Sequence, residues 1–215
     1  MNAKEQFIEF MLSQGVLRFG EFVTKSGRLS PYFVNTGLYS TGEAAQKLGE
    51  FYAAAILEHI GEDFDALFGP AYKGISLAAL TAEALWRVHG KNRTFFYNRK
   101  EAKDHGEGGS FVGKLPERGA RVVIVEDVVT AGTAVRETLP LLQAQGYEVK
   151  DMIVSVNRME KGQTEKSAKE ELKETFDISL SAIVTARDLY DYLVEKGQTE
   201  QAAKMKAYMD TYCVG

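Results

Sequence analysis

The chain alternates short apolar runs with longer stretches in which apolar residues recur every three or four positions. The short runs predict buried strands, and they lie at 64–68, 94–97, 122–125, 149–156 and 178–184. The periodic stretches predict helices at about 75–88, 133–145, 164–175, 187–195 and 200–208. Alternating strands and helices are typical of an α/β fold, so we expect a mostly parallel sheet flanked by helices.

The N-terminal part of the chain follows a different pattern. Apolar residues have helical spacing over 7–12, a second amphipathic helix is predicted at about 43–59, and a strand-prone, loop-rich segment lies between them. We therefore expect one domain over 1–215, made of a small N-terminal hood (about 1–62) and an α/β core (about 63–215).

The composition is that of an ordinary globular chain. Of the 215 residues 45% are hydrophobic and 26% are charged, which excludes disordered and collagen-like classes. The 26 Lys and Arg against 30 Asp and Glu give a net charge of −4, and this balance argues against a nucleic-acid coat. One cysteine, Cys213, permits no internal disulfide and, with three histidines, no zinc cluster.

Charged residues also interrupt the segment in which a signal peptide would be apolar. Lys4, Glu5, Glu9 and Arg18 lie there, and the chain has no apolar run of about 20 residues that could span a membrane. We expect a cytoplasmic protein that binds neither membrane nor nucleic acid.

The strongest chemical signal is the segment 122–134, VVIVEDVVTAGTA. An apolar strand ends in the adjacent carboxylates Glu126 and Asp127, and a turn of small residues then opens a helix. Ligands of α/β sheets bind beyond the carboxyl ends of strands, and a helix N-terminus offers free N–H groups to a phosphate. By these rules alone, two exposed carboxylates followed by a helix cap are an equally good interpretation. P-loop and dinucleotide-binding glycine patterns are absent from the sequence.

Two further loops concentrate glycines and cations. The first, FGPAYKG at 68–74, follows a predicted strand and carries Lys73. The second, NRKEAKDHGEGG at 98–109, carries Arg99, Lys100, Lys103 and His105. Taken alone, the first is typical of a tight turn and the second of a solvated hairpin loop.

Together these segments resemble a known enzyme family. The 122–134 block is similar to the ribose-phosphate motif of type I phosphoribosyltransferases, and 68–74 looks like their pyrophosphate loop. The segment 99–108 closely resembles the catalytic loop of the orotate phosphoribosyltransferases, which separates that branch from purine-using relatives. The segment 22–33 is similar to the N-terminal segment of the same branch, and the resemblance spans nearly the whole chain.

The resemblance to the orotate phosphoribosyltransferases, bacterial single-activity form, implies a reaction and a site. Orotate and 5-phosphoribosyl-1-diphosphate would give orotidine 5′-phosphate and pyrophosphate in pyrimidine biosynthesis, through an oxocarbenium-like transition state. The catalytic group would be Lys103, His105, Arg99, Asp127 and Glu126. The donor would bind Lys25, Tyr72, Lys73, Arg99, Lys100, Lys103, His105, Glu126, Asp127, Val128, Val129, Thr130, Ala131, Gly132, Thr133 and Ala134. Orotate would bind Phe33, Val34, Thr130 and Arg158, with Arg158 holding the orotate carboxylate in a bidentate fork.

The same resemblance implies a cofactor and a partner. Mg²⁺ would be bound through the substrate, with Glu126 and Asp127 as candidate protein ligands. A homodimer is implied, in which the 99–109 loop reaches the active site of the neighbouring subunit. The sequence departs mildly from close bacterial relatives, with Glu126 in place of a frequent Asp and Val34 in place of a frequent Phe.

Two other functions compete with this one. The first is a phosphoribosyltransferase for another base, against which Arg158, the hood and the lysine-rich loop argue. The second is a regulator that senses the donor and has lost catalysis, against which Lys103 and His105 argue, as does the lack of a helix-turn-helix extension or basic face.

Overall fold

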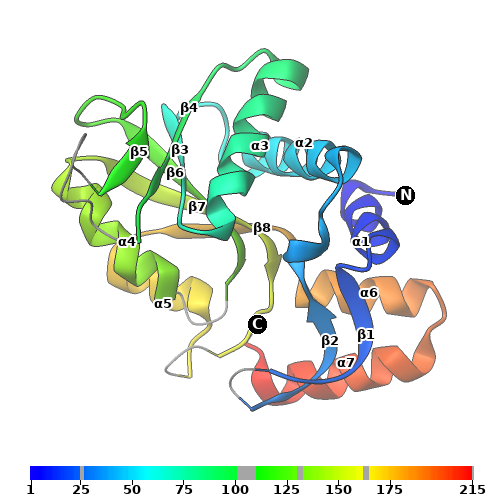
Figure 1. The fold of residues 1–215 in the computed structure, drawn as a ribbon. Helices are drawn as coiled ribbons and strands as arrows, with labels where there is room; N and C mark the ends of the chain where they lie inside the picture. Colours follow the sequence, from blue (N-terminus) through cyan, green and yellow to red (C-terminus); the bar gives the residue numbers. More distant parts are fainter. Residues whose placement is uncertain (25–26, 101–109, 130–132, 162–164, 215) are drawn as a thin grey trace.

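The computed structural model describes residues 1–24, 27–100, 110–129, 133–161 and 165–214, with the backbone alone at 133 and 134 (Figure 1). In chain order the helices are α1 (Ala3–Ser13), α2 (Gly42–His59), α3 (Lys73–His89), α4 (Thr133–Ala144), α5 (Ala168–Phe176), α6 (Ala186–Glu195) and α7 (Thr199–Tyr212), and a 3₁₀ turn, η1, spans Thr36–Leu38. The strands are β1 (Leu17–Val23), β2 (Leu29–Val34), β3 (Ala66–Gly69), β4 (Thr94–Asn98), β5 (Phe111–Gly113), β6 (Arg121–Val129), β7 (Glu148–Asn157) and β8 (Ser179–Thr185).

The predicted α/β architecture is confirmed. Six strands form one sheet in the order β5-β4-β3-β6-β7-β8, and every neighbouring pair is parallel except β4 and β5. Strands β1 and β2 form a separate antiparallel hairpin. The carboxyl ends of β3, β4, β6 and β7 therefore meet at one edge of the large sheet, where ligands of α/β proteins bind.

The central strand β6 is apolar on both faces because both faces are covered. Val123 and Val125 pack into a cluster with residues of α1, α2, α3, α6 and α7. Val122 and Ile124, which alternate with them, pack into a second cluster with residues of α4 and α5. Side chains along a strand alternate between faces, so a run without polar positions is what a doubly covered strand requires.

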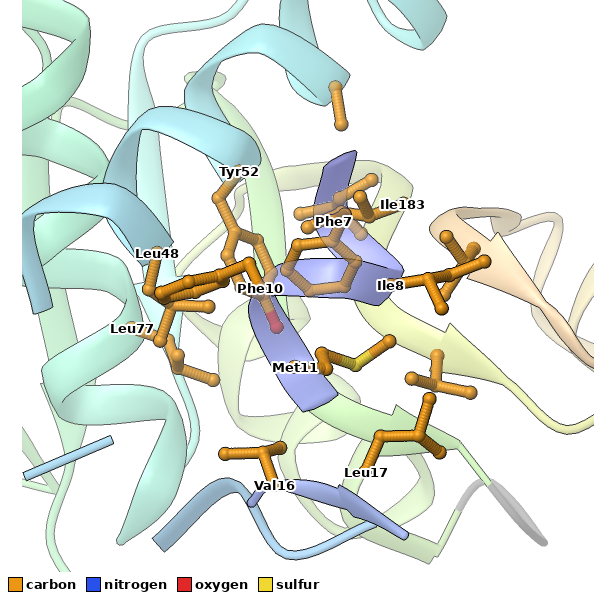
Figure 2. Packing of buried hydrophobic residues seen from close by; sticks show 14 of the residues in the cluster. Phe7, Ile8, Phe10, Met11, Val16, Leu17, Leu48, Tyr52, Leu77 and Ile183 are labelled. Atoms are coloured by element: carbon orange, nitrogen blue, oxygen red, sulfur yellow. The ribbon is translucent and has the colours of Figure 1, made fainter. Parts of the chain in front are cut away.

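Helix α1 anchors the N-terminus in the first of these clusters. Phe7 and Met11 are fully buried, and Figure 2 shows Phe7 beside Tyr52 of α2 and Ile183 of β8, in the cluster that also contains Met11 and Leu48. Burying side chains of this size contributes about 1.5–3 kcal/mol each. This packing fixes α2, and with it the loops at the carboxyl edge, against the sheet.

The C-terminal helices lie beside the β1–β2 hairpin (Figure 1). Beyond α7 the chain returns to the segment that follows β7: Lys161 N donates to Tyr212 O at 2.8 Å, and Val214 N donates to Met159 O at 2.9 Å. The hairpin, the end of α7 and the carboxyl end of β7 are thus held together. None of the helices in the described part of the chain is long and apolar enough to cross a membrane.

Candidate active site

Asp127, near the carboxyl end of β6, accepts hydrogen bonds from two other elements, η1 and the start of α3. Its Oδ2 accepts hydrogen bonds from Lys73 Nζ at 2.7 Å and from Thr36 Oγ1 at 2.8 Å, and its Oδ1 accepts one from Val128 N at 2.7 Å. Burial opposes ionisation, but the bonds from Lys73 and Thr36 hold the pKa of Asp127 below its usual value. Asp127 is therefore an anion at neutral pH.

Glu126, the neighbour of Asp127, is buried, and its pKa is shifted in the opposite direction. Its Oε1 accepts a bond from Asp127 N at 2.9 Å, and Tyr52 OH donates to its backbone carbonyl at 2.7 Å. Burial, aided by the negative charge of Asp127, raises the pKa of Glu126 to about 7. Near neutral pH Glu126 is thus about half protonated, and the two carboxyl groups together carry between one and two negative charges.

The loop between β3 and α3 packs too tightly for any residue but glycine at two positions. A Cβ on Gly69 would lie 2.0 Å from Gly74 O, and one on Gly74 would lie 2.6 Å from Pro70 Cδ. Ala71 N donates to Asn98 Oδ1 at 2.9 Å, and the Ala71–Tyr72 peptide bond is cis.

This loop leads into the N-terminus of α3, which is uncapped. Tyr72 occupies the N-cap position without a capping side-chain bond, so N–H groups of the first turn remain available to an anion. Lys73, the first residue of α3, reaches Asp127. Amide donors and a cation therefore lie next to the Glu126–Asp127 pair, an arrangement suited to a phosphorylated sugar.

The cations after β4 extend this positive region. Arg99 N donates to Ser110 O at 2.8 Å, closing the connection to β5, and Arg99 Nε is buried without a partner among the described residues. Lys100 Nζ lies 5.1 Å from the centre of the Tyr72 ring, which places this lysine beside the β3–α3 loop.

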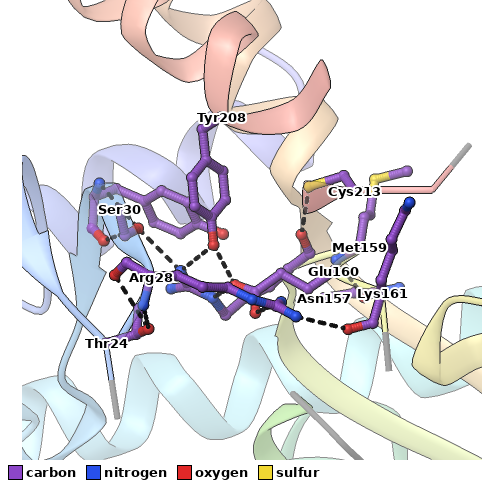
Figure 3. A network of polar contacts seen from close by, with 11 residues as sticks. Thr24, Arg28, Ser30, Asn157, Met159, Glu160, Lys161, Tyr208 and Cys213 are labelled. Atoms are coloured by element: carbon purple, nitrogen blue, oxygen red, sulfur yellow. Dashed lines mark hydrogen bonds and ion pairs between the residues drawn. The ribbon is translucent and has the colours of Figure 1, made fainter. Parts of the chain in front are cut away.

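Arg158 follows β7 and is buried in a polar network (Figure 3). Its Nε donates to Glu160 Oε1 at 2.5 Å, and its Nη2 donates to Ser30 Oγ and to Tyr208 OH, each at 2.9 Å. The guanidinium also lies over the Tyr32 ring, 4.4 Å from its centre. Within the described part of the chain Nη1 is the guanidinium nitrogen that keeps no hydrogen-bond partner, so an anionic ligand would meet Arg158 at that nitrogen.

Phe33 and Val34 end β2 and lead directly to Thr36. Phe33 is partly exposed, and its ring lies 5.8 Å from the Arg18 guanidinium. Arg158 contacts this strand through Ser30 and Tyr32, nearer its start. The segment from Ser30 to Thr36 therefore makes two contacts. Ser30, near the start of β2, contacts Arg158, and Thr36, just beyond the end of β2, contacts Asp127.

Several predicted site residues lie outside the described residues and stay predictions. They are Lys25, Lys103, His105, Thr130, Ala131 and Gly132, together with the side chains of Thr133 and Ala134. Conversely, no pattern in the sequence indicates Thr36 as a partner of Asp127 or Tyr208 as a partner of Arg158. Glu160 is likewise a partner of Arg158 in the structure, and its position two residues after Arg158 is the one sequence feature that suggests this contact.

The described residues offer a metal ion only part of a site. No group of three or more His, Cys, Asp or Glu residues gathers there, and the Glu126–Asp127 pair is the carboxylate cluster at the sheet edge. Mg²⁺ commonly binds through one or two carboxylates together with substrate phosphates. The pair thus fits Mg²⁺ that is bound jointly with a phosphorylated substrate.

Comparisons with known proteins agree with this geometry. Residues 36–191 match the family model described as "Phosphoribosyl transferase domain". The chain is 50% identical over 213 residues to an orotate phosphoribosyltransferase of Clostridium acetobutylicum, covering 97% of this chain and 95% of the relative. It is 49% identical to one of Yersinia enterocolitica, covering 98% of both chains. Among solved structures, an orotate phosphoribosyltransferase of Francisella tularensis has a TM-score of 0.88 at 35% identity, covering 97% of this chain and all of that one.

Proposed function

Because this chain belongs to the orotate phosphoribosyltransferase family of phosphoribosyl transferase domain proteins, we propose that it joins orotate to 5-phosphoribosyl-1-diphosphate. The products are orotidine 5′-phosphate and pyrophosphate, in pyrimidine biosynthesis. The observation that carries the proposal is the convergence on Asp127 of Lys73, the first residue of α3, and Thr36, from the segment after Phe33 and Val34. Asp127 then contacts both the site proposed for the donor, through Lys73, and the segment that forms the proposed base site, through Thr36.

The donor is distributed over three loops. Its ribose hydroxyls bind the Glu126–Asp127 pair. Its 5′-phosphate binds the turn that opens α4, with the backbone and hydroxyls of Val128, Val129, Thr130, Ala131, Gly132, Thr133 and Ala134. Its pyrophosphate binds Lys25, Tyr72, Lys73, Arg99, Lys100, Lys103 and His105. The free N–H groups of α3 support this placement, because helix N-termini favour phosphate.

Orotate lies between the hairpin and the end of β7. The backbone of Phe33 and Val34 and the hydroxyl of Thr130 edge the ring, and Arg158 binds the carboxylate. Nε and Nη2 of Arg158 are engaged by protein groups, so the carboxylate approaches at Nη1, and not in the bidentate fork that the resemblance implies.

In the transfer, a ring nitrogen of orotate that has already released its proton to water forms a bond to C1 of the ribose while the bond from C1 to the pyrophosphate oxygen breaks. The protein contributes positioning and charge stabilisation. Lys103, His105 and Arg99 donate hydrogen bonds to the departing pyrophosphate, and the Asp127 carboxylate faces the positive charge that develops on the ribose. Mg²⁺, when bound, supplies a further positive charge to the diphosphate, with Glu126 and Asp127 as the protein groups that would hold it.

A homodimer completes the proposal. The 99–109 loop reaches the active site of the neighbouring subunit and excludes water from the reacting ribose. The reaction takes place in the cytoplasm, which the single cysteine and the lack of a disulfide partner support.

The test follows the ultraviolet absorbance of orotate after addition of donor and Mg²⁺. We expect turnover by the wild type and a loss of about 100-fold or more in kcat/KM for Asp127→Asn, because a positioned charge at the reacting sugar is removed. Asp63→Asn is the matched control, since Asp63 is exposed and pairs with Arg121 at the amino end of β6. Turnover of hypoxanthine or adenine instead of orotate would assign another base, and donor binding without any turnover would favour the regulator.

A further inference from the structure

Three charged side chains, Arg28, Arg158 and Glu160, form a cluster whose charges do not cancel. Figure 3 shows the network of polar contacts to which this cluster belongs. Glu160 Oε1 accepts a hydrogen bond from Arg158 Nε at 2.5 Å, and Glu160 Oε2 accepts one from Arg28 Nη1 at 3.0 Å. Burial opposes ionisation of Glu160, but the two arginines and the Tyr208 hydroxyl hold its pKa below its usual value. Two cations therefore face one anion, and the cluster carries a net charge of +1.

Among the residues that the structure describes, the groups around the cluster leave that charge uncompensated. Burial raises the pKa of Tyr208 to about 12 and that of Cys213 to about 11, and it raises the pKa of Tyr32 as well, so all three are neutral at physiological pH. Arg187, which also acts electrostatically on Cys213, is a cation. Among the described residues, the next carboxylate along the chain, Glu165, is exposed and paired with Lys161.

Without Arg28, the buried pair of Arg158 and Glu160 would be neutral. A neutral pair gives an incoming carboxylate little net attraction, because Glu160 repels it as Arg158 attracts it. Arg28 binds the far oxygen of Glu160 and offsets that repulsion. It is also held in place, since Nη2 lies 3.5 Å from Lys161 O and the guanidinium lies 5.3 Å from the centre of the Tyr212 ring.

Resting on the proposed function, we propose that Arg28 is a specificity-determining residue for the base. It supplies the unit of positive charge by which the pocket selects a pyrimidine that bears a carboxylate over an uncharged one. Arg28 acts through Glu160 and Arg158, so it is a positioning residue in this reaction.

The test compares two nucleotides that differ by the carboxylate alone, orotidine 5′-phosphate and uridine 5′-phosphate. Their dissociation constants are measured by calorimetry at low and at high salt for wild type, Arg28→Gln, Arg28→Lys and the control Arg121→Gln. Arg121 also pairs with carboxylates, Asp63 and Asp151, but at the amino end of β6.

The preference is the ratio of the dissociation constants of uridine 5′-phosphate and orotidine 5′-phosphate. We expect this ratio to be about tenfold smaller in Arg28→Gln than in wild type, which corresponds to a loss of about 1.4 kcal/mol in binding free energy. Binding of uridine 5′-phosphate should change less than twofold, and the salt dependence of orotidine 5′-phosphate binding should weaken. Arg28→Lys, which retains the charge, and Arg121→Gln should keep the wild-type preference.

An unchanged preference in Arg28→Gln, or equal weakening of both nucleotides, would overturn the inference and assign Arg28 a structural role. Arg28→Lys decides the matter if the glutamine variant does not fold, because loss of the preference in that charged variant also contradicts it. A wild type without any preference would instead contradict the proposed function.

Discussion

The unusual protonation of Glu126 can be measured through protein stability. The substitution Glu126→Gln replaces the carboxyl group by a neutral amide of nearly the same shape. The amide oxygen can still accept the bond from Asp127 N that Glu126 Oε1 accepts at 2.9 Å. The substitution therefore removes an ionisable proton with little change in packing.

The magnitude follows from the pKa. Burial and the adjacent Asp127 move the pKa of Glu126 from an ordinary value of 4.5 to about 7. A tenfold difference in proton affinity between the folded and unfolded states corresponds to about 1.4 kcal/mol, so the effect on the free energy of unfolding amounts to about 3 kcal/mol.

The sign follows from which state holds the proton more tightly. The folded pKa lies above the unfolded one, so the folded state keeps a proton that the unfolded state releases as the pH rises. Wild type is therefore destabilised progressively between about pH 4.5 and pH 7, and the full cost applies above pH 7. The glutamine variant has no such proton and escapes this cost.

Urea unfolding at a series of pH values from 4.5 to 8.5 tests the argument. Glu126→Gln should match wild type at the acidic end and exceed its free energy of unfolding by up to about 3 kcal/mol at the alkaline end. Glu58→Gln, on the exposed surface of α2, controls for removal of one negative charge. A difference between Glu126→Gln and wild type that stays constant with pH would refute the reasoning.

Three further predictions address the loops and the core. Lys103→Ala should lower kcat by about 100-fold or more while circular dichroism shows an intact fold, and a wild-type rate would contradict the assignment of the 99–109 loop. Gly74→Ala should lower the free energy of unfolding by about 1–3 kcal/mol in urea, because its Cβ would lie 2.6 Å from Pro70 Cδ, whereas Gly42→Ala, where the space is open, should not. Tyr52→Phe should cost about 1–3 kcal/mol in calorimetry, because the buried Glu126 carbonyl loses its 2.7 Å bond, and an unchanged stability would show that water replaces the hydroxyl.

Much of the large sheet can be predicted because its strands are buried on both faces. A run such as 122–125 has no polar position, and its length separates it from a helix. The carboxylates at the end of one strand, Glu126 and Asp127, follow from the same argument, since the edge at which parallel strands end is fixed by topology. Arg158 is indicated by the family resemblance alone. Strand β5 has only Phe111–Gly113, too short to form a recognisable run.

The contacts that complete the site are long-range and leave little trace in the sequence. Thr36 and Asp127 are 91 positions apart, and Arg28 and Glu160 are 132 positions apart. The apolar pattern does not predict strand β1 either, because most of its residues are half-buried or exposed and its apolar alternation is incomplete. Such contacts depend on where the β1–β2 hairpin and α7 pack against the rest of the fold. The local pattern of apolar and polar residues does not specify this packing.

In the proposed site, the position of the base relative to the ribose would depend on very few structural elements. Strands β6 and β7 pair in register, with Val128 opposite Val156 and Val129 opposite Asn157, so Asp127 and Arg158 are fixed relative to each other by backbone hydrogen bonds. A single segment, from Ser30 to Thr36, then contacts both: Ser30 accepts from Arg158 and Thr36 donates to Asp127. Strand β2 supplies this segment as far as Val34, and strand backbone extends by a nearly constant 3.3 Å per residue, so most of the spacing between the two side chains is set by the strand. Residues 33 and 34, which edge the proposed base pocket, lie between the two contacts, so the strand pairing of the sheet also sets the spacing of the two side chains that this segment joins.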